Sequence, residues 1–251
     1  MNLPTQPGWE WLDWPLARGT NPRIRAGFST RAGGMSQSPF DTFNLGHTVD
    51  DDPENVAANR AALRRHLQLP TEPRWLNQVH GATVVNAATP DTDRADAAIA
   101  REPGPVCAIL TADCLPLFVG ATDGRAVALA HCGWRGIARG VIESTLHTLG
   151  RPASTLHAYL GPAIGPSAYE VRADMRDELL DLAPDLEHAF DSVSEGRWYA
   201  DLYAMVAARL RAAGVVGVYG GERCTSTESA HFFSHRRDQK TGRMASLIWL
   251  E

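Results

Sequence analysis

Two residues with metal-binding and proton-transfer chemistry flank a pair of apolar runs. Cys114 precedes the run Leu115–Val119, and His131 follows the run Ala126–Ala130. The segment Thr122–Gly124 between them has the composition of a tight turn. Because Cys114 and His131 are at nearly equal distances from this turn, we expect a β-hairpin in which they lie opposite each other. Opposed residues have Cβ atoms roughly 4.5–5.5 Å apart, close enough for the thiol and the imidazole to share one ion or one proton.

His80 is the third candidate ligand, in the motif Asn77-Gln-Val-His-Gly81. Two imidazoles and a thiolate occupy three corners of a zinc tetrahedron and leave the fourth open for water or substrate. The same ligands form the equatorial set of a blue-copper centre, so Cu²⁺ is the alternative to Zn²⁺. Zinc is favoured because none of the five Met residues lies in the loops that carry the three candidate ligands, although Met244 could approach them in space, and because the nine His residues include no His-x-His pair.

The same residues are open to three other interpretations. A metal-free hydrolase would use Cys114 as its nucleophile and His131 as the base. A binding protein would use the three residues as a purely structural zinc site, although no fourth ligand is evident. Free cysteines are mostly buried and inert, so Cys114 can also be a packing residue.

Charged residues accompany the candidate ligands. Asp113 adjoins Cys114 and can orient a ligating His or hold its own loop. The Gly-rich segment 132–140 contains Arg135 and precedes a helix that starts at Val141, a setting that can bind an anion or simply allow a tight turn. The segment matches neither a Walker loop nor Gly-x-Gly-x-x-Gly, so a nucleotide cofactor is not indicated.

The clearest helix signal in the chain precedes these motifs. Asp52 provides a cap, Pro53 suits the first turn, and Val56 and Leu63 recur on one face. Arg60 falls on the same face. Its charge needs a carboxylate or a bound anion there, unless the side chain extends to the rim.

The other predicted elements indicate an α+β fold. Further helices are expected at Val141–Leu149, Arg172–Leu182 and Leu202–Ala213. Strands are expected at Thr83–Asn86, Leu156–Leu160, Val215–Tyr219, His231–Ser234 and Met244–Leu250, with 232–249 as a closing hairpin. Hairpins mixed with capped helices predict mixed β-sheets packed against helices.

No repeat or linker divides the chain, so we expect a single domain over residues 1–251. Its N-terminal extension, residues 1–22, should pack on the body through Trp9, Trp11 and Trp14.

The composition is that of an ordinary globular protein, with 44% hydrophobic and 21% charged residues among 251. The net charge of −5 argues against a nucleic-acid binder, and no run approaches the ~20 apolar residues of a membrane span. Four cysteines in a chain of this length are not a disulfide framework, and the N-terminus lacks the regions of a signal peptide. We therefore expect a cytoplasmic protein without nucleic-acid or membrane partners; the sequence does not indicate its oligomeric state.

Several motifs together resemble the laccase-domain family, also called the multicopper polyphenol oxidase or peptidoglycan-editing-factor family. The motifs follow one another along nearly the whole chain: Gly27–Gly34, Asn77–Gly81, Thr111–Cys114, His131–Arg135, Gly161–Gly165, Phe232–Arg237 and Thr241–Ser246. Two positions depart from the family pattern, since His235 stands where Tyr is expected and Asp50 where Gly usually precedes Asp-Asp-Pro. The roles of these two positions stay open.

The resemblance implies a zinc-dependent purine nucleoside phosphorylase. Such an enzyme cleaves adenosine, inosine, guanosine or methylthioadenosine with phosphate to the base and ribose 1-phosphate, and the resemblance also implies adenosine deaminase side activity. The family's zinc ligands correspond to His80, Cys114 and His131, which would form the catalytic group. A copper-dependent polyphenol oxidase, which fits the family's older name, is a further alternative.

Five other residues are candidates for contacts with nucleoside or phosphate. The resemblance implies that Arg31, Asn44 and Arg60 face the substrates. Gln78, in the His80 motif, and Arg135, shortly after His131, complete the set.

Overall fold

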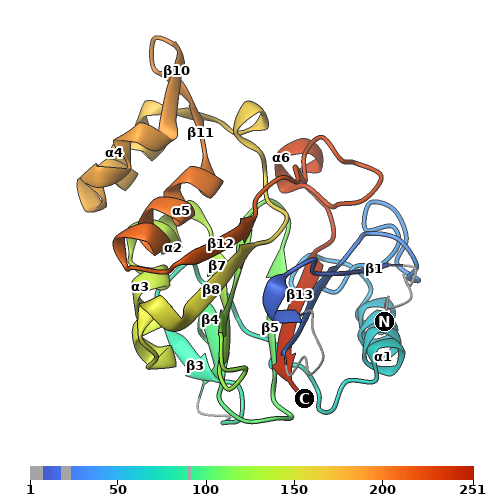
Figure 1. Cartoon of the computed structure of the whole chain (residues 1–251). Helices are drawn as coiled ribbons and strands as arrows, with labels where there is room; N and C mark the ends of the chain where they lie inside the picture. Colours follow the sequence, from blue (N-terminus) through green and yellow to red (C-terminus); the bar gives the residue numbers. More distant parts are fainter. Residues whose placement is uncertain (1–7, 18–23, 90–91) are drawn as a thin grey trace.

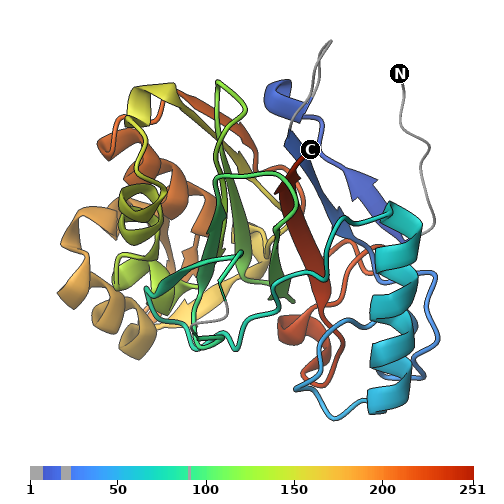
Figure 2. The same cartoon turned by 90° about the horizontal axis from the view of Figure 1, so that it is seen from below.

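The structure, a computed structural model, describes residues 8–17, 24–89 and 92–251. It consists of four layers: helices, a sheet, a second sheet and a further helix. Two β-sheets pack face to face, and helices cover the outer face of each, as Figure 2 shows. The arrangement confirms the predicted α+β fold of mixed sheets packed against helices. Residues 1–7 and 18–22 of the predicted N-terminal extension lie outside the described residues.

The larger sheet has six strands of mixed direction. In spatial order they are β12 (Gly217–Gly220), β8 (Leu156–Leu160), β6 (Leu115–Ala121), β7 (Val127–Cys132), β4 (Ala97–Ala100) and β3 (Val84–Asn86). The outermost pair on each side is parallel, and the inner pairs are antiparallel. Strands β6 and β7 are buried along their whole length because both faces of this sheet are covered.

The second sheet has four antiparallel strands. In spatial order they are β1 (Trp9–Trp11), β2 (Ile24–Ser29), β13 (Met244–Leu250) and β5 (Val106–Thr111). The last strand of the chain is therefore a central strand of its sheet (Figure 1). Trp9 and Trp14 are 2% and 0% exposed, so these tryptophans do pack on the body.

A small third sheet and six α-helices accompany these two sheets among the described residues. The third sheet consists of β10 (Phe190–Ser194), β11 (Arg197–Ala200) and β9 (Glu170–Arg172). The helices are α1 (Pro53–Leu67), α2 (Trp134–Ala138), α3 (Val141–Leu149), α4 (Ala173–Leu182), α5 (Leu202–Ala212) and α6 (His235–Asp238). Helices α2, α3 and α5 cover the six-stranded sheet, α4 packs on α2 and β9, and α1 covers the four-stranded sheet. Within the described ranges, none of the helices has the length and apolar composition that crossing a membrane requires.

Helix α1 forms as its sequence predicts. The side chain of Asp52 accepts a hydrogen bond from the N–H of Glu54, and Pro53 is the first helical residue. Val56 and Leu63 are buried, Leu63 in the core that α1 shares with the four-stranded sheet, while Arg60 is half-buried on the same side of the helix.

The apolar layer between the two sheets supports the loops that carry the candidate ligands. Phe118 and Leu129 of the six-stranded sheet share this core with Phe28 and Ile248 of the other sheet. Full burial of each such side chain contributes roughly 1.5–3 kcal/mol. Cys107 is fully buried in the same layer, and burial raises the pKa of its thiol, as expected of a packing residue.

The hairpin that carries Cys114 and His131 is confirmed, but the predicted register is wrong by two residues. His131 pairs with Pro116, so Cys114 lies just before the first paired residue of β6. The prediction assumed a symmetric turn on Thr122–Gly124, whereas the loop spans residues 122–125 between the hydrogen-bonded Ala121 and Ala126. A shift of two residues keeps both side chains on one face, where diagonal neighbours remain within reach.

The predicted closing hairpin over 232–249 is wrong. Ser234 accepts a hydrogen bond from the N–H of Arg237 and caps the helical turn α6, so 231–234 is not a strand. Both sides of β13 are already occupied by β2 and β5. Phe232 and Phe233, which suggested a strand, are buried in the core between the sheets.

Candidate metal centre

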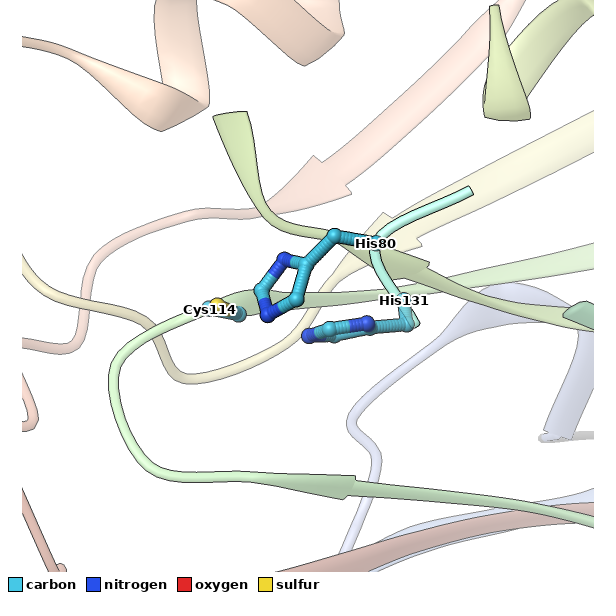
Figure 3. A group of neighbouring side chains, drawn as sticks. All are labelled: His80, Cys114 and His131. Carbon is cyan, nitrogen blue, oxygen red and sulfur yellow. The ribbon is translucent and has the colours of Figure 1, made fainter. Parts of the chain in front are cut away.

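The three candidate ligands meet at one point of the structure. One ligand atom from each of His80, Cys114 and His131 lies within 4.8 Å of the others. Figure 3 shows the two imidazole rings converging with the sulfur of Cys114. We call these residues the metal trio. They come from three separate segments: the loop before β3, the residue that precedes β6, and the end of β7.

Backbone geometry allows the trio to pack this closely. His80 has a φ of 55°, in the left-handed region that L-residues seldom adopt. A Cβ on Gly133 would lie 2.6 Å from Nδ1 of His80 and 3.1 Å from Sγ of Cys114. The first distance is too short for any real contact, so glycine at position 133 is what lets the His80 ring approach the end of β7.

A buried carboxylate holds His131. Nδ1 of His131 lies 2.9 Å from Oδ1 of Asp96, and Asp96 is fully buried. Because a carboxylate accepts hydrogen bonds, Nδ1 carries the proton and Nε2 is left for a metal ion. Burial by itself lowers the pKa of His131, but the charges of Cys114 and Asp96 outweigh it and raise the pKa to about 9. Metal binding would therefore release a proton from this ring.

His80 titrates in the opposite direction. Burial, and then the positive charge of His131, lower the pKa of His80 to about 4. His80 is thus neutral at neutral pH, which is the form in which an imidazole binds a metal ion.

A cavity of about 350 Å³ opens on the metal trio. Its size is within the usual range for small-molecule sites, about 300–1,000 Å³. The remaining lining residues are His47, Thr48, Leu76, Asn77, Gln78, Leu110, Thr111, Ala112, His235 and Arg243. Position 235, which departs from the family pattern, therefore belongs to the wall of this cavity.

Of the five predicted substrate contacts, Gln78 is the one that lines this cavity. Its amide nitrogen donates to the carbonyl of Leu110, and its oxygen accepts from the N–H of Leu110, both at 2.8 Å. These two bonds tie the His80 loop to β5, so Gln78 positions one ligand of the trio.

Arg60 lies behind a lining residue. Its guanidinium donates to the carbonyl of Leu45 at 2.9 and 2.8 Å and stacks on the Trp75 ring at 4.1 Å from the centroid. Nη2 of Arg60 is also 3.1 Å from Nδ1 of His47, which accepts because Arg only donates. Within the protein, the charge of Arg60 thus meets a carbonyl and an aromatic ring.

Arg31 and Asn44 also have partners within the protein. Asn44 is fully buried; its amide nitrogen donates to Asp51 at 2.8 Å, and its oxygen accepts from the N–H of Arg243 at 2.8 Å. Arg31 donates to the carbonyls of Asp41 and Ser229, both at 3.1 Å. Neither side chain is among the residues that line the cavity of the trio.

Arg135 lines a different cavity of about 490 Å³, together with residues such as Tyr169 and Arg236. Its guanidinium stacks on the Trp134 ring at 4.2 Å and lies 3.5 Å from a carboxylate oxygen of Glu178. The Gly-rich segment therefore forms the short helix α2 and turns its arginine away from the cavity of the trio.

Asp113 takes the second of its two predicted roles and holds its own loop. Its carboxylate accepts from the hydroxyl of Thr225 and from the N–H of Arg236, both at 2.6 Å. No hydrogen bond between Asp113 and the metal trio occurs within the described part of the chain.

Three residues of the site are missing from the sequence-based set: Asp96, His47 and Arg243. Asp96 had a usable signal, because a single acid interrupts the small apolar residues Ala95–Ala100 and must have partners if that run is buried. Arg243 stands within the motif Thr241–Ser246 and His47 three residues after Asn44, but nothing in their spacing indicates a shared cavity.

The donor set fits zinc better than blue copper. Two imidazole nitrogens and a thiolate around a point that opens on a cavity are typical of a catalytic zinc site with one free position. A blue-copper site would need a weak axial ligand such as Met. Sδ of Met244 instead lies 3.1 Å from the backbone nitrogen of Phe233, and Met is absent from the described residues that line the cavity.

The comparisons with known proteins each cover most of the chain. Residues 25–251 match the family model described as multi-copper polyphenol oxidoreductase laccase. A purine nucleoside phosphorylase of Pseudomonas aeruginosa is 48% identical over 244 residues, which cover 96% of this chain and 98% of that protein. The purine nucleoside phosphorylase YfiH of Escherichia coli is 43% identical over 239 residues, covering 94% and 96%.

Solved structures show the same fold. A Neisseria meningitidis protein has a TM-score of 0.91 at 43% identity, covering 97% of this chain and 99% of that one. YlmD from Geobacillus stearothermophilus has a TM-score of 0.84 at 33% identity, covering 97% and 96%. With the family model and these relatives spanning nearly its whole length, the chain belongs to the multi-copper polyphenol oxidoreductase laccase family.

Proposed function

We propose that this chain is a zinc-dependent purine nucleoside phosphorylase. It transfers the ribosyl group of adenosine, inosine, guanosine or methylthioadenosine to phosphate. The bond from C1′ to the base breaks, a bond from C1′ to a phosphate oxygen forms, and the products are the base and the sugar 1-phosphate. The single observation that carries the proposal is the metal trio at the wall of a cavity of about 350 Å³. The P. aeruginosa and E. coli relatives, both named purine nucleoside phosphorylases, support it.

The chain's own residues would hold the ion and shape its surroundings. His80, Cys114 and His131 are the proposed ligands, and an ion bound there would act as a Lewis acid on an oxygen in the cavity. Gln78 fixes the loop that carries His80, and Asp96 fixes His131. Such preorganisation matters because positioning of two substrates supplies a large part of the rate.

Arg243 is the proposed phosphate contact. It lines the cavity, and its Nη1 donates to the carbonyls of Thr241 and Gly242 at 2.9 and 3.0 Å, which fixes the guanidinium. Burial lowers the pKa of Arg243 while the charges of Cys114 and Asp113 oppose this, and an Arg side chain stays protonated throughout the neutral range. Its remaining N–H groups can bind an anion bidentately.

The substrate roles first assigned to Arg31, Asn44 and Arg60 become roles in positioning. Arg60 would act on the cavity through His47, whose Nδ1 accepts from Arg60. The proton of a neutral His47 is then on Nε2, which can donate to a bound nucleoside or phosphate. Burial, followed by the charge of Arg60, lowers the pKa of His47 and favours this neutral form.

Other activities would share the site. Adenosine deaminase side activity is part of the proposal, because a Lewis-acid site beside a purine could direct water to C6. A metal-free hydrolase based on Cys114 and His131 remains the first rival, and a copper-dependent polyphenol oxidase the second. We place the reaction in the cytoplasm because all four cysteines are unpaired thiols.

The test is the initial rate of inosine cleavage across a phosphate titration, with both products identified. The proposal predicts a rate that saturates with phosphate and yields ribose 1-phosphate and hypoxanthine. A rate independent of phosphate, with free ribose as the product, would show a hydrolase and contradict it.

A further inference from the structure

We infer that Asp96 is the positioning residue of the metal trio, because its single carboxylate fixes the orientation of both imidazoles. The inference rests on the proposed metal site and is independent of which nucleoside, if any, the cavity accepts. It also explains why the trio converges although its residues come from three separate segments.

The carboxylate of Asp96 accepts four hydrogen bonds. Oδ1 accepts from the backbone N–H of His80 and from Nδ1 of His131, both at 2.9 Å. Oδ2 accepts from the N–H of Gly81 at 2.7 Å and from the N–H of Val79 at 3.2 Å. Asp96 is 0% exposed, so protein donors replace the water that an ionised carboxylate would otherwise need.

On one side, the carboxylate sets the conformation of the His80 loop. Three successive backbone N–H groups that converge on one anion form a nest, a concave arrangement more familiar from phosphate sites. Here the anion is a side chain of the same protein. The left-handed φ of 55° at His80 is unfavourable for an L-residue, and the nest stabilises it. The direction of the His80 ring therefore depends on Asp96.

On the other side, the carboxylate selects the tautomer of His131. The pairing of Ala97 with Ala130 places Asp96 across from His131, and the N–H of His131 donates to the Asp96 carbonyl at 2.7 Å. The side-chain bond then keeps the proton on Nδ1 and leaves the lone pair of Nε2 for the ion.

An asparagine cannot reproduce both functions. If its oxygen takes the place of Oδ1, its NH₂ group faces the N–H groups of Val79 and Gly81, and the nest opens. If its oxygen takes the place of Oδ2, the NH₂ group faces Nδ1 of His131, which must then accept, so the proton moves to Nε2 and blocks the ligand position. Either arrangement weakens metal binding without removing a ligand.

Asp113→Asn is the matched control for Asp96→Asn. Asp113 is also a mostly buried carboxylate near Cys114, at 9% exposure, but it accepts its hydrogen bonds from Thr225 and Arg236. Zinc affinity of the apo-proteins would be measured by competition with a chromophoric chelator, and the ligand geometry by the absorption spectrum of the cobalt-substituted forms. We expect Asp96→Asn to weaken zinc binding about 10- to 100-fold and to alter the cobalt spectrum. Asp113→Asn should leave both close to wild type.

Two results would overturn the inference: wild-type zinc affinity in Asp96→Asn, or an equal loss in both variants. A second measurement does not depend on the folding of any variant. In the zinc-loaded wild type, ¹⁵N NMR of the histidine side chains should find the His131 proton on Nδ1. A proton on Nε2 of His131 would contradict the inference. Neither readout uses nucleoside, so the inference and the proposed phosphorylase activity can fail separately.

Discussion

Two polar clusters meet at Arg243. Its side chain lines the cavity of the metal trio, and its backbone N–H donates to the oxygen of Asn44. The Asn44 oxygen also accepts from Gly46 at 2.9 Å, and its nitrogen donates to Gly46 and Asp51 at 3.1 and 2.8 Å. Asn44 therefore has no hydrogen-bonding capacity left for a ligand, whereas the trio presents ligand atoms to a cavity.

The two clusters differ in how many of their polar groups have partners within the protein. We define the N-terminal polar network as Arg31, Asn44, Asn59 and Arg60. Its side chains form hydrogen bonds chiefly with backbone carbonyl and N–H groups. These bonds fix segments of the backbone that are neither helix nor strand. In the trio, by contrast, the bonds to Asp96 end at Nδ1 of His131 and at the backbone N–H of His80, so they occupy neither Nε2 of His131 nor the ring of His80. A polar side chain near a site can bind a ligand directly only if at least one of its donor or acceptor groups has no partner within the protein.

The largest effect on zinc binding and turnover is expected when a residue of the metal trio is replaced, in contrast to a packing residue. Cys114→Ala removes one of three ligands, so zinc binding and turnover should both be lost. Cys107→Ala, a fully buried thiol in the core, should keep its zinc and lose stability only. Measuring the zinc content and the rate of inosine cleavage of both purified variants checks this prediction. A Cys114→Ala protein that keeps its zinc but is inactive would favour the cysteine-nucleophile mechanism.

The next largest effect is expected on the KM for phosphate, where Arg243 of the cavity and Arg60 of the N-terminal polar network should differ. Arg243→Lys keeps the charge but loses the planar fork, and the KM for phosphate should rise about tenfold, the equivalent of about 1.4 kcal/mol. Arg60→Lys should raise it less, because Arg60 is not among the described residues that line the cavity and contacts His47, which does line it. Phosphate titrations at saturating inosine distinguish the two. A larger rise in KM for Arg60→Lys than for Arg243→Lys would indicate that phosphate binds at the N-terminal polar network and not at Arg243.

A smaller effect is expected in stability alone. Asn44→Ala leaves buried groups without partners, including the N–H of Arg243, and should lower the free energy of unfolding by about 1–3 kcal/mol. Zinc affinity should stay at the wild-type value. Urea unfolding and chelator competition on the same sample check both statements. A loss of zinc affinity without a loss of stability would mean that Asn44 belongs to the metal centre.

The smallest effect is expected at Arg31. Its ion pair with Asp41 spans 3.3 Å and is partly exposed, so Arg31→Lys should change the free energy of unfolding by no more than about 1 kcal/mol. KM values for phosphate and inosine should not change. A marked rise in either KM would show that the side chain leaves its carbonyl partners to meet a substrate.

The sequence predicts well those features that depend on local signals. Helices α1 and α3 and strands β8 and β13 follow from caps and apolar runs, and the trio follows from residue type and motif order. Strand β4 is short and Ala-rich, so it gives no clear strand signal, and Asp96 beside it stays unnoticed although it bonds to both histidine segments. The roles of Arg60 and Asn44 depend on backbone carbonyls that only the folded chain brings to them.

We infer that the metal trio is an open site for one ion and lies beside a polar network whose hydrogen bonds are satisfied within the protein. Diffraction from crystals of the purified protein, recorded on both sides of the zinc absorption edge, tests it most directly. We predict one zinc per chain, as a single anomalous peak between Cys114, His80 and His131, with no protein ligand in its fourth position. A fully active protein without that peak, a peak at the copper edge instead, or a fourth protein ligand that closes the site would contradict the account.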